Sequence, residues 1–321
     1  ELRINNVTSD LTVHLVCYEE EHQGGDNDPV IEGNTLVKWD AVGDVVVPNN
    51  VKHIADYAFM GSKLTGLTIS AQVETIGVLP FMYCGQLKKL EVDAANPHFK
   101  SVDNAVYSKD GKELVQVAIV YPKEVFTLPT SVEKVRTGAF TFAMSIKKIE
   151  GSNDFFETVD GMLIRKADRA LMHYPSFVQQ GQAAKPIELP SDIKKIERYA
   201  FAFNFVPQEL VLPESLEVLE DYAFNGAANI VKLKIDHCKA LKRVGNFCFK
   251  GCFRLASFDL PKEGVTFIGE QALQGTAIVS LNIPTNVQIG ANAFRGCQSI
   301  ANVFSFNTVP PVLDDLAFSD I

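Results

Sequence analysis

A short pattern of hydrophobic and polar residues recurs along most of the chain. Its clearest copies end at Phe59, Phe201 and Phe224, and each contains an aliphatic residue, two polar residues, an aromatic residue and then Ala-Phe. Weaker copies end at Phe81, Phe140, Phe249, Leu273, Phe294 and Phe318. Most of these anchor residues lie 21 to 25 positions apart, whereas two gaps span 59 and 61 positions. A fixed period of this length predicts a solenoid of stacked repeats.

A second pattern follows most anchors by eight or nine residues, and it consists of an apolar residue, one outward residue and usually another apolar residue. Its copies are 67–69, 90–92, 210–212, 233–235, 258–260 and 281–283. This alternation predicts a short strand with one buried face. Pro213, Pro261 and Pro284 follow three of these segments and would end strand pairing there. Each repeat is therefore predicted to contain a strand, a turn, a second extended segment and a short helical or irregular turn carrying Ala-Phe.

Stacking of such units predicts a curved, right-handed coil with parallel β-strands on its concave face. One unit cannot bury its own apolar side, whereas stacked units share a continuous core. The anchor phenylalanines are then expected to fill this core and not to form a ligand-binding stripe. We expect one continuous solenoid from about residue 31, with Phe59, Phe140, Phe224 and Phe294 along a single buried row.

The repeat resembles the BspA-like leucine-rich repeats, whose consensus is close to L-x-x-L-x-L-P-x-S-V-x-x-I-G-x-x-A-F-x-G-C. Residues 210–226 follow this consensus almost throughout, and the resemblance extends over about 31–321. It implies a leucine-rich-repeat solenoid in a bacterial protein that is secreted or attached to the cell surface. Adhesion or host-protein binding is the role usually proposed for such proteins.

The two long gaps are expected to hold β-hairpin inserts, near residues 96–128 and 153–189. Segments 99–107 and 156–164 align with each other at an offset of 57 positions. Asp110-Gly111 in the first gap suits a tight hairpin turn that needs positive φ. Both inserts would extend the sheet of the solenoid.

The N-terminal residues lie outside the repeat. Residues 1–18 alternate like one or two strands and are expected to be a cap or the tail of a preceding β module. Residues 19–30 are expected to be a polar linker, and residues 31–321 form the predicted repeat domain. The sequence begins at Glu1 without a signal-like start, so we expect an export signal to be missing from it.

Composition narrows the classes of partner. Hydrophobic residues make up 46% and charged residues 21% of the chain, which is typical of a folded protein. The formal net charge of -9 repels phosphate backbones and anionic lipids, and no run of Lys or Arg reverses it locally. We therefore expect neither nucleic acid nor a membrane surface as partner, and no apolar stretch is long enough for a membrane span.

The cysteines follow the repeat and predict no chemistry. Cys84, Cys252 and Cys297 each lie three residues after an anchor, and Cys248 replaces the Ala before Phe249. These are positions for small buried residues, so we expect reduced, buried thiols. Zinc would need a second pair of ligands, and none is evident. No cofactor or metal is therefore expected.

Motifs typical of enzymes are also missing from the sequence. It has no Gly-x-Ser-x-Gly elbow, no phosphate-binding glycine loop and no dinucleotide fingerprint. The Glu19-Glu20-Glu21 run in the linker is better explained as solvated charge than as a calcium site. We therefore expect a protein that is not an enzyme.

Two functions remain open. The first is a recognition module that binds a protein or glycan on a host or neighbouring cell through its strand-lined face. The second is a passive spacer that presents another surface module. The candidate binding residues, called the outward row, are Thr68, Glu91, Glu150, Val211, Lys234, Asp259, Asn282 and Phe304. We expect binding to depend mainly on the C-terminal half, where the repeats run without long insertions.

Overall fold

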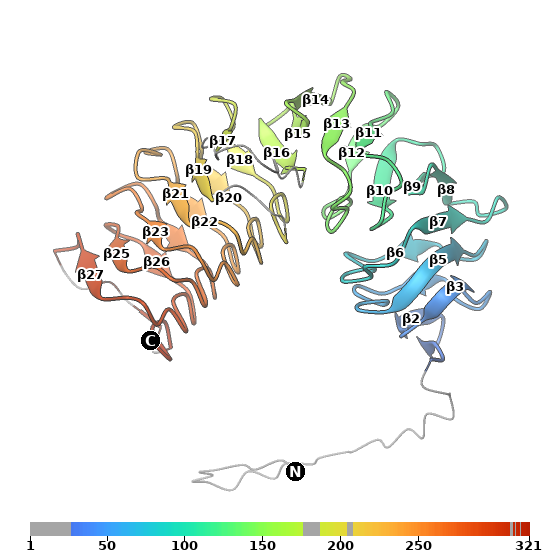
Figure 1. Ribbon diagram of the computed structural model, residues 1–321, viewed down its shortest axis with the longest axis horizontal. Helices are drawn as coiled ribbons and strands as arrows, with labels where there is room; N and C mark the ends of the chain where they lie inside the picture. The colour runs from blue at the N-terminus through green and yellow to red at the C-terminus, as the bar shows by residue number, and fades with distance from the viewer. Residues whose placement is uncertain (1–26, 176–186, 204–207, 309–310, 312, 315) are drawn as a thin grey trace, which may run out of the picture.

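The computed structural model describes residues 27–175, 187–203, 208–308, 311, 313–314 and 316–321. Over these residues the chain consists of β-strands and turns without a helix, and Figure 1 shows it as an arch. The strands of the N-terminal half form one arm of the arch and those of the C-terminal half form the other. The predicted N-terminal segment 1–18 and most of the linker lie outside the described residues.

The coils contribute strands to two sets of sheets. The first set holds the strands predicted from the apolar alternation: β3 (Val42–Val46), β5 (Lys63–Ile69) and β7 (Lys89–Val92); β11 (Val125–Thr127) and β13 (Lys148–Glu150); β17 (Ile187–Glu188), β19 (Glu209–Val211), β21 (Lys232–Lys234) and β23 (Ser257–Phe258); β25 (Ser280–Ile283) and β27 (Asn302–Ser305). The second set holds β1 (Val30–Glu32), β2 (Thr35–Lys38), β4 (His53–Ile54) and β6 (Thr75–Ile76); β8 (Phe99–Val102), β9 (Ala105–Ser108), β10 (Glu113–Val117) and β12 (Lys134–Val135); β14 (Phe156–Val159), β15 (Met162–Arg165), β16 (Ala170–His173), β18 (Lys195–Ile196), β20 (Val218–Leu219), β22 (Arg243–Val244), β24 (Phe267–Ile268) and β26 (Gln288–Ile289). The predicted β-solenoid is therefore confirmed.

Parallel pairing keeps equivalent residues of successive coils in register. Leu210, Leu233 and Phe258 pair across β19, β21 and β23, and each is at most 2% exposed. A slip by one residue would turn these side chains to the outer face of the sheet, so their burial fixes the register. The apolar alternation thus sets both the strands and their alignment.

The anchor phenylalanines fill the core, as predicted. Phe224 stacks on Phe201 at 4.5 Å and on Phe249 at 4.9 Å between ring centroids. Phe59, Phe140, Phe224 and Phe294 are all at most 3% exposed, but they belong to three separate core clusters. The clusters divide near the two long gaps, where inserted strands interrupt the repeat.

Both long gaps contain antiparallel strands. Strands β8, β9 and β10 form one meander, and β14, β15 and β16 form the other. Asp103-Asn104 joins β8 to β9 and Asp160-Gly161 joins β14 to β15, with φ between 49° and 82°, as a two-residue type I′ turn requires. The predicted turn at Asp110-Gly111 lies between β9 and β10, where Gly111 has a φ of 80°. Strands β10 and β16 then pair in parallel with β12 and β18.

The Ala-Phe turns with anchors from Phe59 to Phe294 are irregular, and each passes twice through the left-handed region. The residue two before the anchor has positive φ, for example Tyr199 at 64° and Tyr222 at 60°. The residue two after the anchor also has positive φ, for example Gly226 at 68° and Gly251 at 79°. Glycine adopts this conformation without steric cost, which explains the glycine of the repeat at this second position, called here the glycine slot.

Ala-Phe turns from the two arms meet on the inner side of the arch. Leu79 of the N-terminal arm packs with Tyr199 and Ala202 of the C-terminal arm in a small buried cluster. Gly138 allows a close approach there, because a Cβ at this residue would lie 2.5 Å from Leu79 Cδ2. Coils more than 100 residues apart can touch only on the inside of a bend. Figure 1 accordingly shows loops along the inner edge and strands running between the inner and outer edges.

The position of the strands differs from the predicted strand-lined concave face. When one side of a coil is helical, the bulkier helices occupy the outside of the curve and push the sheet to the inside. Within the described residues both sides of each coil are strands and turns, so neither sheet is forced inward. Figure 1 shows the bend near β8–β16, where the inserted strands lie.

Three aromatic residues occupy glycine slots at the bend. Tyr83, Phe142 and Phe203 have φ of 62°, 68° and 55°. Their ring centroids lie 4.9 Å apart for Tyr83–Phe142, 5.5 Å for Tyr83–Phe203 and 4.6 Å for Phe142–Phe203. A left-handed backbone costs about 1–2 kcal/mol for a residue with a Cβ. We call these three residues the inner aromatic cluster, and their contacts offset this cost.

The repeat cysteines are free and buried, as predicted. The Cys84, Cys252 and Cys297 thiols lie 2.9 to 3.1 Å from the anchor carbonyl oxygens of earlier coils, to which they donate. Burial raises the pKa of the Cys252 thiol to about 12. These thiols therefore pack as small apolar groups that form internal hydrogen bonds, and the thiolate is disfavoured.

We expect Cys84, Cys248, Cys252 and Cys297 all to react with an alkylating agent in denaturant without reductant. In the native protein the same thiols should react slowly, because burial shields them and keeps them protonated. Mass spectrometry of the labelled peptides measures both results. A disulfide between any two of these cysteines would contradict the assignment.

Candidate binding surface

The outward row lies on the first set of sheets, but it is not continuous. Thr68 and Glu91 are neighbours in the pairing of β5 with β7. Glu150 lies on β13, which pairs only with β11 among the described strands. The C-terminal members form a separate series on β19 to β27. The inserted strands thus divide the row into three parts, and the last and longest part lies on two sheets, β17 to β23 and β25 with β27.

The structure brings the five C-terminal members of the row together. Val211 pairs with Lys234, and Asn282 pairs with Phe304. Asp259 follows β23 directly and contacts the second pair, because its Oδ1 accepts a hydrogen bond of 3.2 Å from Asn282 Nδ2. Lys234 and Asp259 are exposed, Val211 is half-buried and the Phe304 side chain is 54% exposed.

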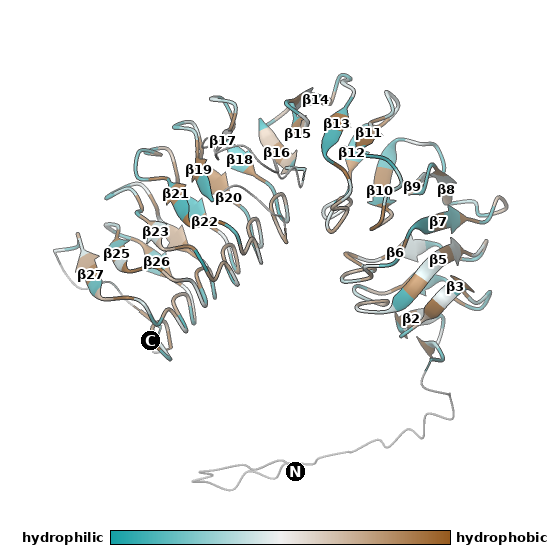
Figure 2. Cartoon of the chain, in the orientation of Figure 1, coloured by the Kyte–Doolittle hydropathy of each residue, from teal (hydrophilic) through white to brown (hydrophobic). Residues whose placement is uncertain are grey.

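Both ends of the first set carry exposed apolar side chains. Val42 and Val46 on β3 are 55% and 61% exposed, and Val303 on β27 is 46% exposed beside Phe304. Figure 2 shows hydrophobic colour on β3 and β27 and hydrophilic colour on β13 and β21 between them. The surface is therefore polar along its length and apolar at its ends.

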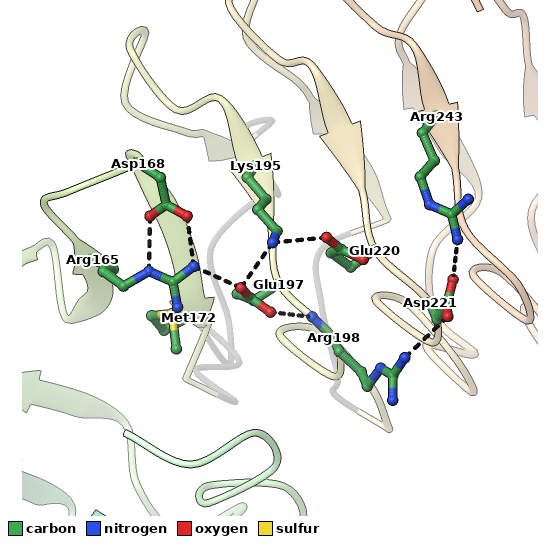
Figure 3. Close-up of polar contacts among 9 residues, drawn as sticks. All are labelled: Arg165, Asp168, Met172, Lys195, Glu197, Arg198, Glu220, Asp221 and Arg243. Atoms are coloured by element: carbon green, nitrogen blue, oxygen red, sulfur yellow. Dashed lines mark hydrogen bonds and ion pairs between the residues drawn. The ribbon is translucent and has the colours of Figure 1, made fainter. Parts of the chain in front are cut away.

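The second set of sheets carries a series of ion pairs, shown in Figure 3. Arg165 pairs with Asp168 and Glu197, Lys195 pairs with Glu197 and Glu220, and Asp221 pairs with Arg198 and Arg243. Burial opposes ionisation of Glu197, but its hydrogen bonds and the charges of Arg165 and Lys195 hold its pKa below the usual value. Each cation already has an anionic partner on a neighbouring coil. These pairs therefore join coils to one another and leave little charge for a ligand.

The lysines on and around β21 and β23 differ from the paired Lys89 of β7 and Lys148 of β13, because they lack such partners. Residues 222–262 contain six Lys, two Arg and two Asp, a net charge of +6 in a chain of net charge -9. Within the described residues no ion pair involves Lys232, Lys234, Lys239, Lys242 or Lys262. The sequence shows no run of basic residues here, as expected, and the window is bounded by Asp221, which pairs with Arg243, and by Glu263. These lysines are not adjacent in the sequence. They lie near one another because they belong to one or two stacked coils.

Two further features of the described part of the chain concern metal ions and membranes. No group of three or more His, Cys, Asp or Glu side chains there is placed to hold a metal ion. None of the described segments is a helix with the length and hydrophobicity of a membrane span.

The repeat pattern matches a known family. The family model described as BspA type leucine rich repeat region, in six copies, matches residues 31–119 and 175–301. These ranges make up more than half of the chain. No curated protein sequence matches it.

Solved structures share the fold. A leucine rich cell surface protein from Faecalibacterium prausnitzii is 18% identical, with a TM-score of 0.52, over 90% of this chain and 100% of that chain. A leucine-rich repeat protein from Eubacterium ventriosum is 16% identical, with a TM-score of 0.53, over 86% of this chain and 81% of that chain. At these identities the likeness supports the solenoid fold and no finer property.

Proposed function

Since the chain belongs to the BspA-type leucine-rich repeat family, we propose that it is a recognition module at the cell surface or in secreted form. Its ligand is a protein or glycan on a host cell or a neighbouring microbe. One structural neighbour is described as a cell surface protein, which agrees with this location. The proposed contact surface is the C-terminal part of the outward row.

The observation that carries the proposal is the alignment of two in-register pairs of the outward row, Val211 with Lys234 and Asn282 with Phe304. This part of the row offers a cation at Lys234, hydrogen-bonding groups at Asp259 and Asn282, and an exposed ring at Phe304. Aromatic side chains contribute strongly to binding energy, and surrounding polar groups give specificity. The alternative function is a passive spacer, for which an evenly polar surface without an exposed ring would be sufficient.

We expect the double variant Lys234→Ala, Phe304→Ala to lose retention of extracellular ligands. Both side chains point away from the core, so the fold should change in stability by no more than about 0.5 kcal/mol per site. The loss of an exposed ring at a contact should weaken binding by about 2 kcal/mol or more. Pull-down of host-cell or extracellular-matrix components by immobilised wild type and variant measures the difference.

The matched control is Lys63→Ala, Val46→Ala, which removes an exposed lysine and an exposed apolar side chain from the N-terminal end of the first set. It should retain whatever the wild type retains, with circular dichroism showing that both variants are folded. Equal retention by the wild type and the Lys234, Phe304 variant would place binding elsewhere. If the wild type retains no component at all, the spacer function is favoured.

A further inference from the structure

A polar groove lies beside the C-terminal part of the outward row, between the turns of two consecutive coils. Lys239, Lys242 and Asp236 line it from the turn after β21. Lys262, Glu263 and Asp259 line it from the turn after β23. Asn282 of β25 completes the lining, so the groove is continuous with the row. Its floor includes Leu260, which is 2% exposed and belongs to the core.

The two turns are held firmly against each other. Gly264 has a φ of 100°, and a Cβ at this residue would lie 3.0 Å from the carbonyl oxygen of Lys239. The amide of Thr266 donates a 2.8 Å hydrogen bond to the carbonyl oxygen of Lys242. The backbone of the groove is therefore fixed by stacking of the coils, as expected for a largely pre-formed ligand site.

The lysines of the groove are available to a ligand. Within the described residues, Lys239, Lys242 and Lys262 take part in no ion pair, and Lys262 lies over the Phe306 ring at 5.3 Å. The cations of the second set, by contrast, have their carboxylates on neighbouring coils. A cation without an internal partner can form a charge-assisted hydrogen bond with an incoming anion.

The acidic residues of the groove restrict which anion fits. Asp236, Asp259 and Glu263 would repel a densely charged chain such as a phosphate backbone or a run of acidic residues. The same carboxylates, with the Asn282 side-chain oxygen, are acceptors for hydroxyl donors. Phe304 lies next to Asn282 on the paired strand and offers an apolar face for a sugar ring. The lining thus suits a ligand with one negative charge and several hydroxyl groups.

We propose that this groove binds an acidic sugar, either a hexuronic acid or a sialic acid unit of a glycan. Lys239, Lys242 and Lys262 contact its carboxylate, while Asp259, Glu263 and Asn282 accept hydrogen bonds from its hydroxyl groups. This proposal rests on the proposed recognition function, and it names the class of ligand that the C-terminal part of the outward row would bind.

The test is calorimetric titration of the purified protein with 3′-sialyllactose, with an oligogalacturonate and with neutral lactose. The first two probes distinguish the two sources of acidic sugar. We expect one of them to bind and lactose to bind at least about tenfold more weakly, since it cannot use the lysines. The double variant Lys239→Ala, Lys242→Ala should lose about tenfold or more in affinity. Both side chains are exposed, so its fold should be retained.

The matched control is Lys63→Ala, Lys88→Ala, which removes two exposed lysines of the N-terminal arm. It should bind the acidic sugar as the wild type does. Equal binding of lactose and the acidic probes would overturn the role of the lysines, and so would an unchanged affinity of the groove variant. If neither acidic probe binds while the pull-down retains a protein that depends on Lys234 and Phe304, the groove proposal fails and the recognition function stands.

Discussion

Replacement of Tyr83, Phe142 and Phe203 together by glycine is expected to open the arch while leaving each arm folded. These residues link Ala-Phe turns from coils that are distant in sequence, through three ring contacts of 4.6 to 5.5 Å. Each such pair contributes about 0.5–1.5 kcal/mol beyond its burial. Loss of all three would shift the ratio of closed to open arches by about 10- to 2000-fold.

The coils themselves should not be destabilised by the same change. All three residues have left-handed φ whether or not the arms touch, and glycine relieves about 1–2 kcal/mol of backbone cost at each. Glycine is also the residue that other coils carry in this slot, for example Gly226 and Gly251. Small-angle X-ray scattering should therefore show a larger radius of gyration for the triple variant, while thermal unfolding followed by circular dichroism changes little.

The matched control is Phe253→Gly, which removes a 69% exposed ring that lies outside the inner aromatic cluster. It should leave the scattering profile unchanged. A triple variant with the wild-type profile would mean that stacking of the coils alone fixes the bend. A triple variant that unfolds would mean instead that the cluster stabilises the coils.

The repeat could be predicted from the sequence because it rests on local hydrophobic alternation. Strands such as β19 and β21 and anchors such as Phe224 follow directly from residue type and period. The path of the arch could not be predicted, because it depends on contacts such as Leu79 with Tyr199, whose partners are 120 positions apart. The sequence nevertheless contains a sign of the contact between the arms, because aromatic residues replace glycine in the glycine slot only where the arms meet.

The candidate surface was predicted less completely. The in-register position of Val211, Lys234, Asn282 and Phe304 follows from the repeat period, and the structure agrees. The groove next to it was missed, because its lysines come from two turns that lie side by side only after the coils stack. A count of basic and acidic residues per coil, in place of a search for basic runs, would have found it.

Another buried group gives the protein a pH-dependent stability. His173 of β16 is 8% exposed and stacks on Phe140 at 5.1 Å between ring centroids. Burial lowers its pKa to about 3, from an ordinary value of 6.5. Arg136, Glu197 and Arg198 line the small cavity beside its ring. The folded protein therefore keeps this imidazole neutral at pH values where the unfolded chain binds a proton.

The direction of the effect follows from proton binding in the two states. Above pH 6.5 neither state protonates His173, so its contribution to folding is fully present. Between pH 6.5 and about 3 only the unfolded chain binds the proton, so stability falls as the pH falls, by about 1.4 kcal/mol per unit. The loss between pH 7 and pH 5 is therefore about 2 kcal/mol. Carboxylates with lowered pKa, such as Glu113 and Glu197, lose their contributions only at lower pH.

We expect urea unfolding of the wild type to show this loss of about 2 kcal/mol between pH 7 and pH 5, and the variant His173→Phe to show a flat profile over the same range. Phenylalanine keeps the ring that stacks on Phe140 and has no group to protonate. His173→Leu is the second variant, in case the phenylalanine ring does not fit the cavity. The free energy of unfolding at pH 7, 6 and 5 measures the slope for each protein. A wild type whose stability stays constant over this range, or a slope that persists in both variants, would show that His173 is not the group that titrates.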